Sequence, residues 1–155
     1  MANEKVKGCV IFKDLHYSVK DNTWIKVDGD IVTIGMTDIA QSLAGPILHA
    51  KTKSVGTARK KGRPIATVES GKWVGPVKSP VTGEIIEVNG GLASDAQLIN
   101  RSPYNDGWVV KMKASNLEAE MAELTTGDEA VAAYREKIEQ DGVECKHLEG
   151  TDSYD

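Results

Sequence analysis

Lys72 has the sequence setting that most clearly permits chemistry. A β-branched run from Ile65 to Val68 leads through Ser70-Gly71-Lys72 into a second run that begins at Trp73. Glycine tolerates the positive φ that tight turns need, so the break between the two runs predicts a hairpin tip. A primary amine at such a tip is accessible to a modifying enzyme, and the strands fix where an attached group points. An ordinary solvated lysine on a turn is the alternative.

Groupings typical of an active site are absent from the sequence. The three histidines, His16, His49 and His147, are not at metal-ligand spacing with one another or with the cysteines. No nucleophile elbow or phosphate-binding loop is present. Ser70 is interpreted as a polar residue of the turn and not as a nucleophile. We therefore expect neither catalytic residues nor a metal site, and we do not expect an enzyme.

Length and charge limit the class of protein. The 155 residues fit a single domain, 1–155, which can bury roughly 70% of the surface that its unfolded chain exposes. The net charge is −4 and the 19 Lys and Arg residues look scattered, so nucleic acid is not an expected partner. The sequence has no apolar h-region at its start and no run approaching the roughly 18 apolar residues of a membrane span. The expected location is the cytoplasm.

The two cysteines, Cys9 and Cys145, lie near opposite ends of the chain. Two cysteines do not make a disulfide framework, and cytoplasmic thiols are normally reduced. The spacing alone therefore predicts buried, unreactive thiols.

Short elements punctuated by turn residues are expected over the first two thirds. Apolar runs at 24–27 and 31–35 flank Asp28-Gly29-Asp30, which predicts a hairpin. A short helix follows, capped by Thr37 or Asp38 with Gln41 completing a capping box, and Gly45-Pro46 ends it. Closely spaced Gly and Pro from 47 to 88 predict short strands in a small sandwich or barrel. Residues 90–102 are expected to be a loop with a short turn, and 107–112 one more strand.

The last third changes to a helical period. Two capping-box pairs, Ser115 with Glu118 and Thr126 with Glu129, each precede apolar residues at helical spacing. They predict two amphipathic helices, the second ending at Gly142, and a frayed tail from 150 to 155. The expected fold is α+β and mostly β, with one short inserted helix and two C-terminal helices.

Several motifs, in order, resemble the H proteins of the glycine cleavage system. They are V-G-T-A-R-K-K-G at 55–62, E-S-G-K at 69–72, S-P-V-T-G-E-I-I-E-V-N at 79–89 and N-R-S-P-Y-N-D-G-W-V-V-K at 100–111. The resemblance extends from about Tyr17 to about Tyr134. It implies a lipoyl/biotinyl-type hybrid β-barrel-sandwich, with lipoate attached to Lys72 by a lipoate-protein ligase. Glu69 also matches the family, where a carboxylate at this position could be recognised by the ligase. The alternative is that Glu69 is only a solvent-exposed polar residue of the strand.

Three departures from typical H proteins concern the region of the arm. Thr23, in K-D-N-T-W at 20–24, replaces a glutamate that in the family helps to receive the aminomethyl-loaded arm. A-K-T-K at 50–53 replaces V-E-L-P and makes an acidic, apolar surface basic. Gly71 and Trp73 flank Lys72 where the family reads E-S-V-K-A. Trp73 is expected to be an apolar resting place for the arm or a docking anchor, and burial in the core is the alternative.

A second branch of the fold shares some of these departures. E-S-G-K-W-V-G-P at 69–76, Gly8-Cys9 and Cys145 resemble lipoate-binding proteins of a heterodisulfide-reductase-like sulfur-oxidation pathway. This resemblance implies an arm that carries sulfur-bound groups, partners among subunits of that complex or dihydrolipoamide dehydrogenase, and a redox role for Cys9 and Cys145 if they meet each other or the arm.

Basic residues at Lys51, Lys53 and Arg59 would favour an anionic group on the arm if they lie close to Lys72. A glycine cleavage H protein that carries the aminomethyl group, and an unmodified interaction module, are the alternative functions.

Overall fold

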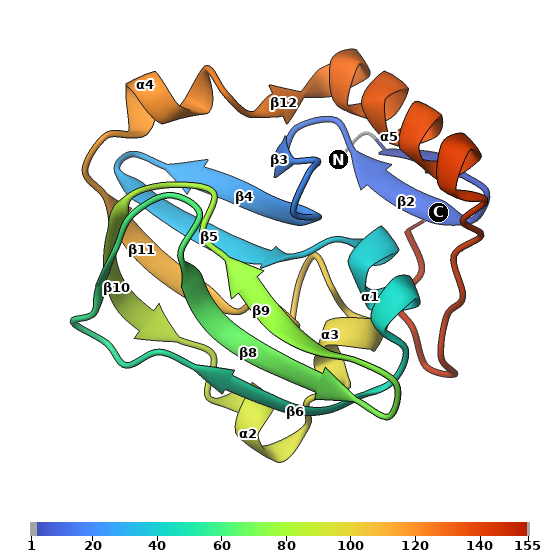
Figure 1. Cartoon of the computed structure of the whole chain (residues 1–155), viewed down its shortest axis with the longest axis horizontal. Helices are drawn as coiled ribbons and strands as arrows, with labels where there is room; N and C mark the ends of the chain where they lie inside the picture. The colour runs from blue at the N-terminus through green and yellow to red at the C-terminus, as the bar shows by residue number, and fades with distance from the viewer. Residues whose placement is uncertain (1–2, 155) are drawn as a thin grey trace.

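Two antiparallel sheets face each other across a common core. In the computed structural model, which describes residues 3–154, a three-stranded sheet of order β6-β8-β9 packs against a curved seven-stranded sheet of order β12-β3-β4-β5-β11-β10-β7 (Figure 1). The strands of the smaller sheet are β6 (Ile47–Thr52), β8 (Pro64–Ser70) and β9 (Val74–Lys78). Those of the larger sheet are β3 (His16–Ser18), β4 (Thr23–Asp28), β5 (Ile31–Met36), β7 (Ala58–Arg59), β10 (Gly83–Val88), β11 (Val110–Ala114) and β12 (Thr125–Thr126).

The main core lies between these sheets because each strand presents alternate side chains to it. Ile34 of β5 and Ile85 of β10 pack in the same buried cluster as Val68 of β8 and Val77 of β9. On β8 the neighbours of Val68, Thr67 and Glu69, point to solvent, as the two-residue period of a strand requires. The expectation of a mostly β sandwich with several helices is confirmed.

A second apolar layer covers one side of the larger sheet. The hairpin of β1 (Asn3–Val6) and β2 (Cys9–Phe12) lies beside α5 (Gly127–Asp141), as Figure 1 shows. Tyr17 and Tyr134 meet there edge to face, with ring centroids 5.5 Å apart. This layer holds the first strands and the last long helix together.

The hairpin predicted at Asp28-Gly29-Asp30 is confirmed. Asp28 pairs with Ile31, so Gly29 and Asp30 are the two loop residues, and Gly29 has a φ of +64°. The short helix after it is α1 (Asp38–Ala44), and Thr37 is its N-cap, because the Thr37 hydroxyl accepts from the Ala40 N–H at 3.2 Å. Gln41 does not complete a capping box.

The connection from 90 to 102 was expected to be a loop, and this is wrong. It contains two helical turns, α2 (Gly91–Ser94) and α3 (Leu98–Arg101). The strand expected at 107–112 begins only at Val110.

The two C-terminal helices are present, but the first, α4 (Leu117–Met121), is short. Neither predicted capping box forms, because both hydroxyls find tertiary partners: Ser115 donates to the Thr82 carbonyl and Thr126 to the Leu15 carbonyl. Gly142 ends α5 in the left-handed conformation, as expected.

The tail was expected to be frayed, and this too is wrong for residues 150–154. The Ser102 hydroxyl donates to the Asp152 carboxylate at 2.5 Å, and the Asp152 N–H donates to the Arg101 carbonyl at 2.7 Å. The Tyr154 ring packs edge to face on Phe12. The last residues therefore form part of the packed structure.

Candidate functional site

The tip of the β8–β9 hairpin presents Lys72 to solvent, as the sequence predicted. The Ser70 N–H donates to the Trp73 carbonyl at 2.8 Å, and the Ser70 hydroxyl accepts from the Lys72 N–H at 3.3 Å. These two bonds close the turn and fix the direction in which the Lys72 backbone faces. Gly71 is exposed with no neighbouring atom within 4 Å of a built Cβ, but its φ is not positive, so our expectation of a left-handed glycine is wrong.

The Lys72 side chain lies across the end of α1. Its Cε is 3.1 Å from where a Cβ on Gly45 would stand, so a side chain at position 45 would press on the lysine. Gly45 also has a φ of +78°, which glycine adopts without strain. The glycine that the sequence marked as a helix stop therefore also makes room for Lys72, and no local signal indicated this second role.

A cavity of about 210 Å³ opens beside the tip. Residues of α1 and β9 and the Trp73 side chain contribute to its lining. The lining residues are Asp21, Asn22, Thr23, Met36, Ala40, Leu43, Ala44, Trp73, Pro76 and Val77. Most of these are apolar, so the cavity suits an apolar ring better than an ion.

Trp73 belongs to the surface and not to the core. The side chain is 39% exposed, and its ring lies against Gly75, where a built Cβ would be only 2.2 Å from the nearest ring carbon. Leu43, Leu48 and Val74 are also exposed, at 49%, 55% and 63%. We call Leu43, Leu48, Trp73 and Val74 the apolar rim. Exposed apolar side chains that cluster around a hairpin tip are typical of a docking surface.

The polar groups of the cavity are few. Thr23 is 1% exposed, and its hydroxyl has no hydrogen-bond partner among the described residues. Asp21 supplies a carboxylate, which the sequence did not indicate because Asp21 reaches the cavity only through the tertiary fold. Lys137 reaches the same segment from α5 and donates to the Val19 carbonyl at 2.6 Å and to Asn22 Oδ1 at 3.0 Å. Partial burial lowers the pKa of Lys137, and the Asp141 and Asp21 carboxylates oppose that shift.

Glu69 and the basic residues lie at different distances from the tip. Glu69 is exposed on β8, opposite His49 of β6 and Val74 of β9. The Lys53 N–H pairs with the Ile65 carbonyl, five strand residues or about 16 Å before Ser70.

Arg59 lies on the other sheet, opposite Gly83. Lys51, opposite Thr67, is about 10 Å along the strand from Ser70. Lys53 and Arg59 therefore do not lie close to Lys72, which was the condition for their favouring an anionic group on the arm.

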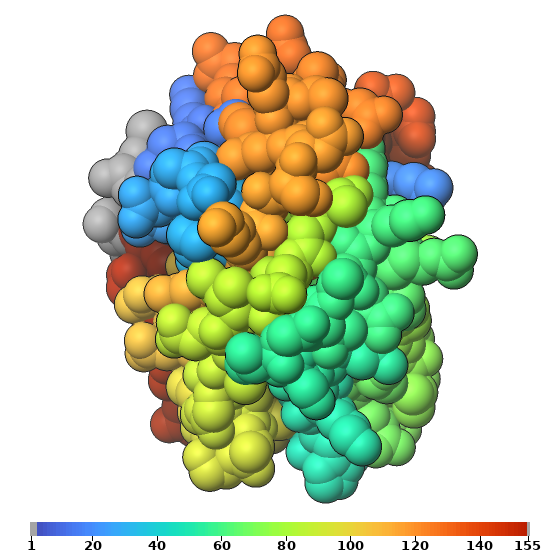
Figure 2. Space-filling model, turned by 90° about the vertical axis from the view of Figure 1, so that its left-hand side faces the viewer, coloured from blue at the N-terminus to red at the C-terminus, as the bar shows by residue number. Residues whose placement is uncertain are grey.

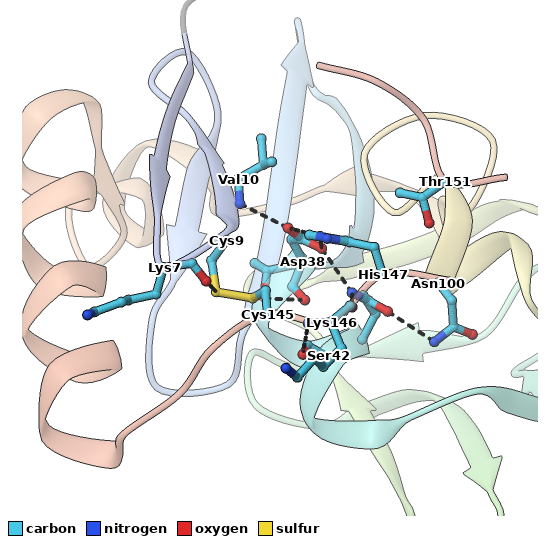
Figure 3. A network of polar contacts seen from close by, with 12 residues as sticks. Lys7, Cys9, Val10, Asp38, Ser42, Asn100, Cys145, Lys146, His147 and Thr151 are labelled. Carbon is cyan, nitrogen blue, oxygen red and sulfur yellow. Dashed lines mark hydrogen bonds and ion pairs between the residues drawn. A yellow bond between two sulfur atoms is a disulfide. The ribbon is translucent and has the colours of Figure 1, made fainter. Parts of the chain in front are cut away.

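Cys9 and Cys145 form a disulfide, so the expectation of reduced thiols is wrong. Their separation of 136 positions did not indicate the bond, and only the resemblance had implied that the two cysteines could approach each other. Figure 3 shows the disulfide beside Asp38, the first residue of α1. The buried Asp38 carboxylate accepts from the Val10 N–H at 2.9 Å and contacts His147 Nε2 at 2.9 Å. The disulfide and the segment after it thus anchor the start of the helix whose end touches Lys72.

The segment around Lys146 continues this support along α1. The Lys146 N–H donates to the Ser42 hydroxyl at 2.7 Å (Figure 3). The Gln41 side-chain amide donates to the Lys146 carbonyl at 2.8 Å. Asn100 donates from its amide to the Gly45 carbonyl at 2.9 Å and accepts from the Ile47 N–H at 2.9 Å. Both ends of α1 are therefore fixed by side chains from distant parts of the chain, which holds the cavity wall in place.

Within residues 3–154, no group of three or more His, Cys, Asp and Glu side chains is arranged to hold a metal ion. Among the same residues, no helix has the length and apolar character needed to cross a membrane.

Comparisons with known proteins give one consistent family. A model of the family described as Glycine cleavage H-protein matches residues 15–137. "Glycine cleavage system H protein 2" of Aquifex aeolicus is 46% identical over 143 residues, covering 92% of this chain and 89% of that protein. "Probable glycine cleavage system H protein 2" of Saccharolobus solfataricus is 44% identical, covering 91% and 97%. A crystal structure of a glycine cleavage system H protein from Mycobacterium marinum superposes with a TM-score of 0.70 at 28% identity, covering 86% of this chain and 100% of that one.

Proposed function

This chain belongs to the glycine cleavage H-protein family, and from that premise we propose that it is a lipoyl carrier with the cofactor attached to Lys72. Proteins of this family carry lipoate covalently on a lysine and act as carriers, not catalysts. The observation that supports Lys72 is its place at the exposed tip of a rigid hairpin, beside an apolar cavity. The same family interacts with lipoate-protein ligase and with dihydrolipoamide dehydrogenase, which are the partners we propose here.

The residues around Lys72 fit a lipoyl group. The open space at Gly71 leaves the amine accessible to a ligase, and Glu69 stands exposed near the turn for such an enzyme to read. The cavity of about 210 Å³ has apolar walls that include Met36 and Trp73, which suit a small sulfur-containing ring. When bound, lipoate supplies a dithiolane that accepts and releases groups by thiol–disulfide exchange.

The chain's own residues position the lysine and shield the cavity. Hydrogen bonds across the β8–β9 tip limit the directions in which Lys72 can point, and Gly45 leaves a passage for its alkyl chain. Trp73 and Leu43 reduce the access of water to the cavity. The apolar rim offers partner enzymes an area whose burial favours docking, and an aromatic anchor of this kind can contribute about 2 kcal/mol or more.

Our first candidate for the cargo is a sulfur-bound group, passed between enzymes of a heterodisulfide-reductase-like sulfur-oxidation system. The support comes from the cavity, where Thr23 offers a neutral hydroxyl and the ammonium of Lys137 lies near the carboxylate of Asp21. Lys137 offsets part of the negative charge of Asp21, which makes the cavity less unfavourable for an anionic cargo. Lys53 and Arg59 lie too far from Lys72 to add to this argument.

The second candidate is the aminomethyl group of glycine cleavage. It is supported by the names of the relatives from Aquifex aeolicus and Saccharolobus solfataricus described above, which are called glycine cleavage system H proteins. The Asp21 carboxylate at the cavity also suits a cationic amine. An unmodified interaction module is the remaining alternative.

The attachment site is tested by intact mass after expression with a lipoate-protein ligase and lipoate. We expect one lipoyl group on the wild type, none on Lys72→Arg, and one on Lys78→Arg, a matched exposed lysine of the same hairpin. The free energy of unfolding should change by less than about 0.5 kcal/mol in both variants, because exposed positions contribute little to stability. Lipoamide mapped to Lys61 or Lys78 would contradict the assignment, and an unmodified wild type would favour the interaction module.

The cargo is tested by offering the lipoylated protein to glycine decarboxylase and the aminomethyl-transfer enzyme. Exchange of labelled bicarbonate into glycine is measured beside a typical H protein, with Lys72→Arg as the baseline. For a sulfur carrier we expect exchange at least about tenfold slower than for the typical H protein, a difference of roughly 1.4 kcal/mol. Equal rates would mean that Thr23 and Trp73 do not redirect the arm, and the second candidate would then stand.

A further inference from the structure

The cations of this chain are not scattered, contrary to our expectation from the sequence. Residues 51–63 contain six of them, Lys51, Lys53, Arg59, Lys60, Lys61 and Arg63, and no Asp or Glu. The whole chain has a net charge of −4, so this basic segment carries +6 while the remaining residues carry −10. Such segregation of charge is typical of a surface that meets a charged partner.

The basic segment lies at the end of the small sheet opposite Lys72. It joins the end of β6 to the start of β8, whereas Lys72 follows the end of β8. The seven residues of β8 separate Arg63, the last residue of the segment, from the tip by about 23 Å, whereas Lys51, the first, lies about 10 Å along the strand from Ser70. In Figure 1 the connection is drawn on the left and the tip of the β8–β9 hairpin on the right. The segment and the lysine therefore face different surroundings.

A groove of about 650 Å³ adjoins the basic segment. Ala58, Glu84 and Lys113 form a cross-strand row over β7, β10 and β11, and Arg59 and Lys60 stand at its edge. Figure 2 looks onto this side, where the green segment lies beside yellow-green residues of β10 and below the orange region near α4. The groove is bounded by the edge strand of the larger sheet.

Most cations of the basic segment lack internal partners. Among the described residues, Lys61 pairs with Glu123, whereas no ion pair is formed by Lys51, Lys53, Arg59, Lys60 or Arg63. Arg59 Nε is buried and has no hydrogen-bond acceptor within residues 3–154. Lys53, Lys60 and Arg63 are exposed, so their charges are available to the acidic groups of a ligand. Glu84 is the one acid among the residues that line the groove, and it faces Lys113 across the strands.

The apolar content of the groove narrows the class of ligand. Ala58, Gly83 and Ala114 contribute to its lining, and Val55 of the adjoining loop is 57% exposed. A nucleic acid would meet the charge of −10 on the rest of the chain, which repels an extended polyanion. A short acidic protein segment fits better, because its carboxylates can pair with the cations while its apolar side chains cover the floor.

We propose that this basic groove binds an acidic, partly apolar segment of a partner protein, which holds the carrier by the end opposite Lys72. A carrier held in this way keeps its lysine end free for other enzymes. Tethering then raises the effective concentration of the lysine end at active sites of the same assembly, without new contacts at the tip. The inference rests on the proposed function only in that Lys72 bears the lipoyl group.

The direct test uses a synthetic peptide rich in glutamate with interspersed leucine as the probe. Binding to the whole protein is followed by amide NMR shifts at physiological ionic strength. Lys60→Glu with Lys113→Glu removes two groove cations and brings the net charge to −8. Lys26→Glu with Arg135→Glu reverses two exposed cations outside the groove and gives the same net charge, so it is the matched control.

We expect shifts confined to residues 53–63, 82–84 and 113–115, a Kd raised about tenfold by the groove variant, and a change below about twofold for the control. Equal weakening by both variants would show an effect of net charge alone and overturn the proposal. Absence of binding, or tighter binding of a single-stranded DNA oligonucleotide than of the peptide, would also overturn it.

Lipoylation provides the second readout. The ligase should modify Lys72 at the same rate with and without saturating peptide, because the two ends do not overlap. Competition between peptide and ligase would contradict the opposite-end arrangement. Failure of lipoylation in all samples, with peptide binding intact, would instead reject the proposed function and leave the groove as a binding site.

Discussion

Gly35 and Gly75 each lie under a tryptophan ring. Replacing Gly35 by alanine should lower the stability of the protein much more than replacing Gly75 by alanine. A Cβ on Gly75 would be 2.2 Å from the nearest atom of Trp73, and a Cβ on Gly35 would be 2.5 Å from Trp24. Neither glycine has a positive φ, so alanine brings no backbone strain at either site. The difference must come from whether the ring can move.

The structure sets the expected magnitudes. Trp24 is 2% exposed and its Nε1 donates to the Met36 and Pro103 carbonyls, both at 3.0 Å. Forcing that ring aside combines overpacking of about 1–3 kcal/mol with the partial loss of two hydrogen bonds at about 1 kcal/mol each. Alanine returns about 0.4–1 kcal/mol by restricting the unfolded chain, so Gly35→Ala should cost roughly 2–4 kcal/mol. Trp73 can swing into solvent, so Gly75→Ala should stay within about 1 kcal/mol of the wild type.

Urea unfolding followed by circular dichroism measures both costs. Fluorescence reports the ring, because Gly75→Ala should expose Trp73 and shift its emission to longer wavelength, and Trp73→Phe is the control that removes this signal. In lipoylated protein, Gly75→Ala should also speed reduction of the dithiolane by a small phosphine, since Trp73 no longer covers the cavity. Equal unfolding costs for the two alanine variants would refute the reasoning, as would an unchanged emission spectrum for Gly75→Ala.

Two further predictions concern the second apolar layer. Alkylation of the native protein without reductant should label neither Cys9 nor Cys145, and two labelled thiols would contradict the disulfide. Replacing both by serine should lower the free energy of unfolding by about 2–5 kcal/mol, because the cross-link closes a loop of 136 residues. Burial raises the pKa of Tyr134 far above its ordinary value of 10, so the folded state keeps its proton where the unfolded chain loses it, and stability present below pH 10 should fall as pH rises above 10. Tyr134→Phe should reduce the loss of stability at alkaline pH, measured by urea titrations at several pH values. At pH 7 it should change stability by only about 1 kcal/mol, since the hydroxyl has no hydrogen-bond partner among the described residues. An unaltered loss at alkaline pH would exclude Tyr134 as its source.

Local signals were sufficient for the hairpins and for the place of Lys72. The Asp-Gly pair at 28–29 and the break at 70–72 act through the conformations of a few adjacent residues, which any tertiary setting must respect. The same holds for Gly45 and Gly142, whose positive φ values end α1 and α5. Such features can be recognised from sequence because they depend on the conformations of only a few consecutive residues.

Capping was less predictable because side-chain oxygens have a choice of partners. Thr37 caps α1, but Ser115 and Thr126 donate to carbonyls of distant segments. A hydroxyl one or two residues before a helix is therefore a local option, and packing decides whether it is used.

The sequence by itself determined that a lysine would stand at the tip of a hairpin in a mostly β protein, because turn chemistry and the two-residue period are local. Only the tertiary structure decided what surrounds that lysine. Asp21, Met36, Leu43 and Trp73 come from four separate segments, and their approach depends on how the two sheets and α1 pack. The disulfide and the basic groove likewise join positions far apart in the chain. Contacts of this kind follow from the burial of the whole core, which no short stretch of sequence specifies.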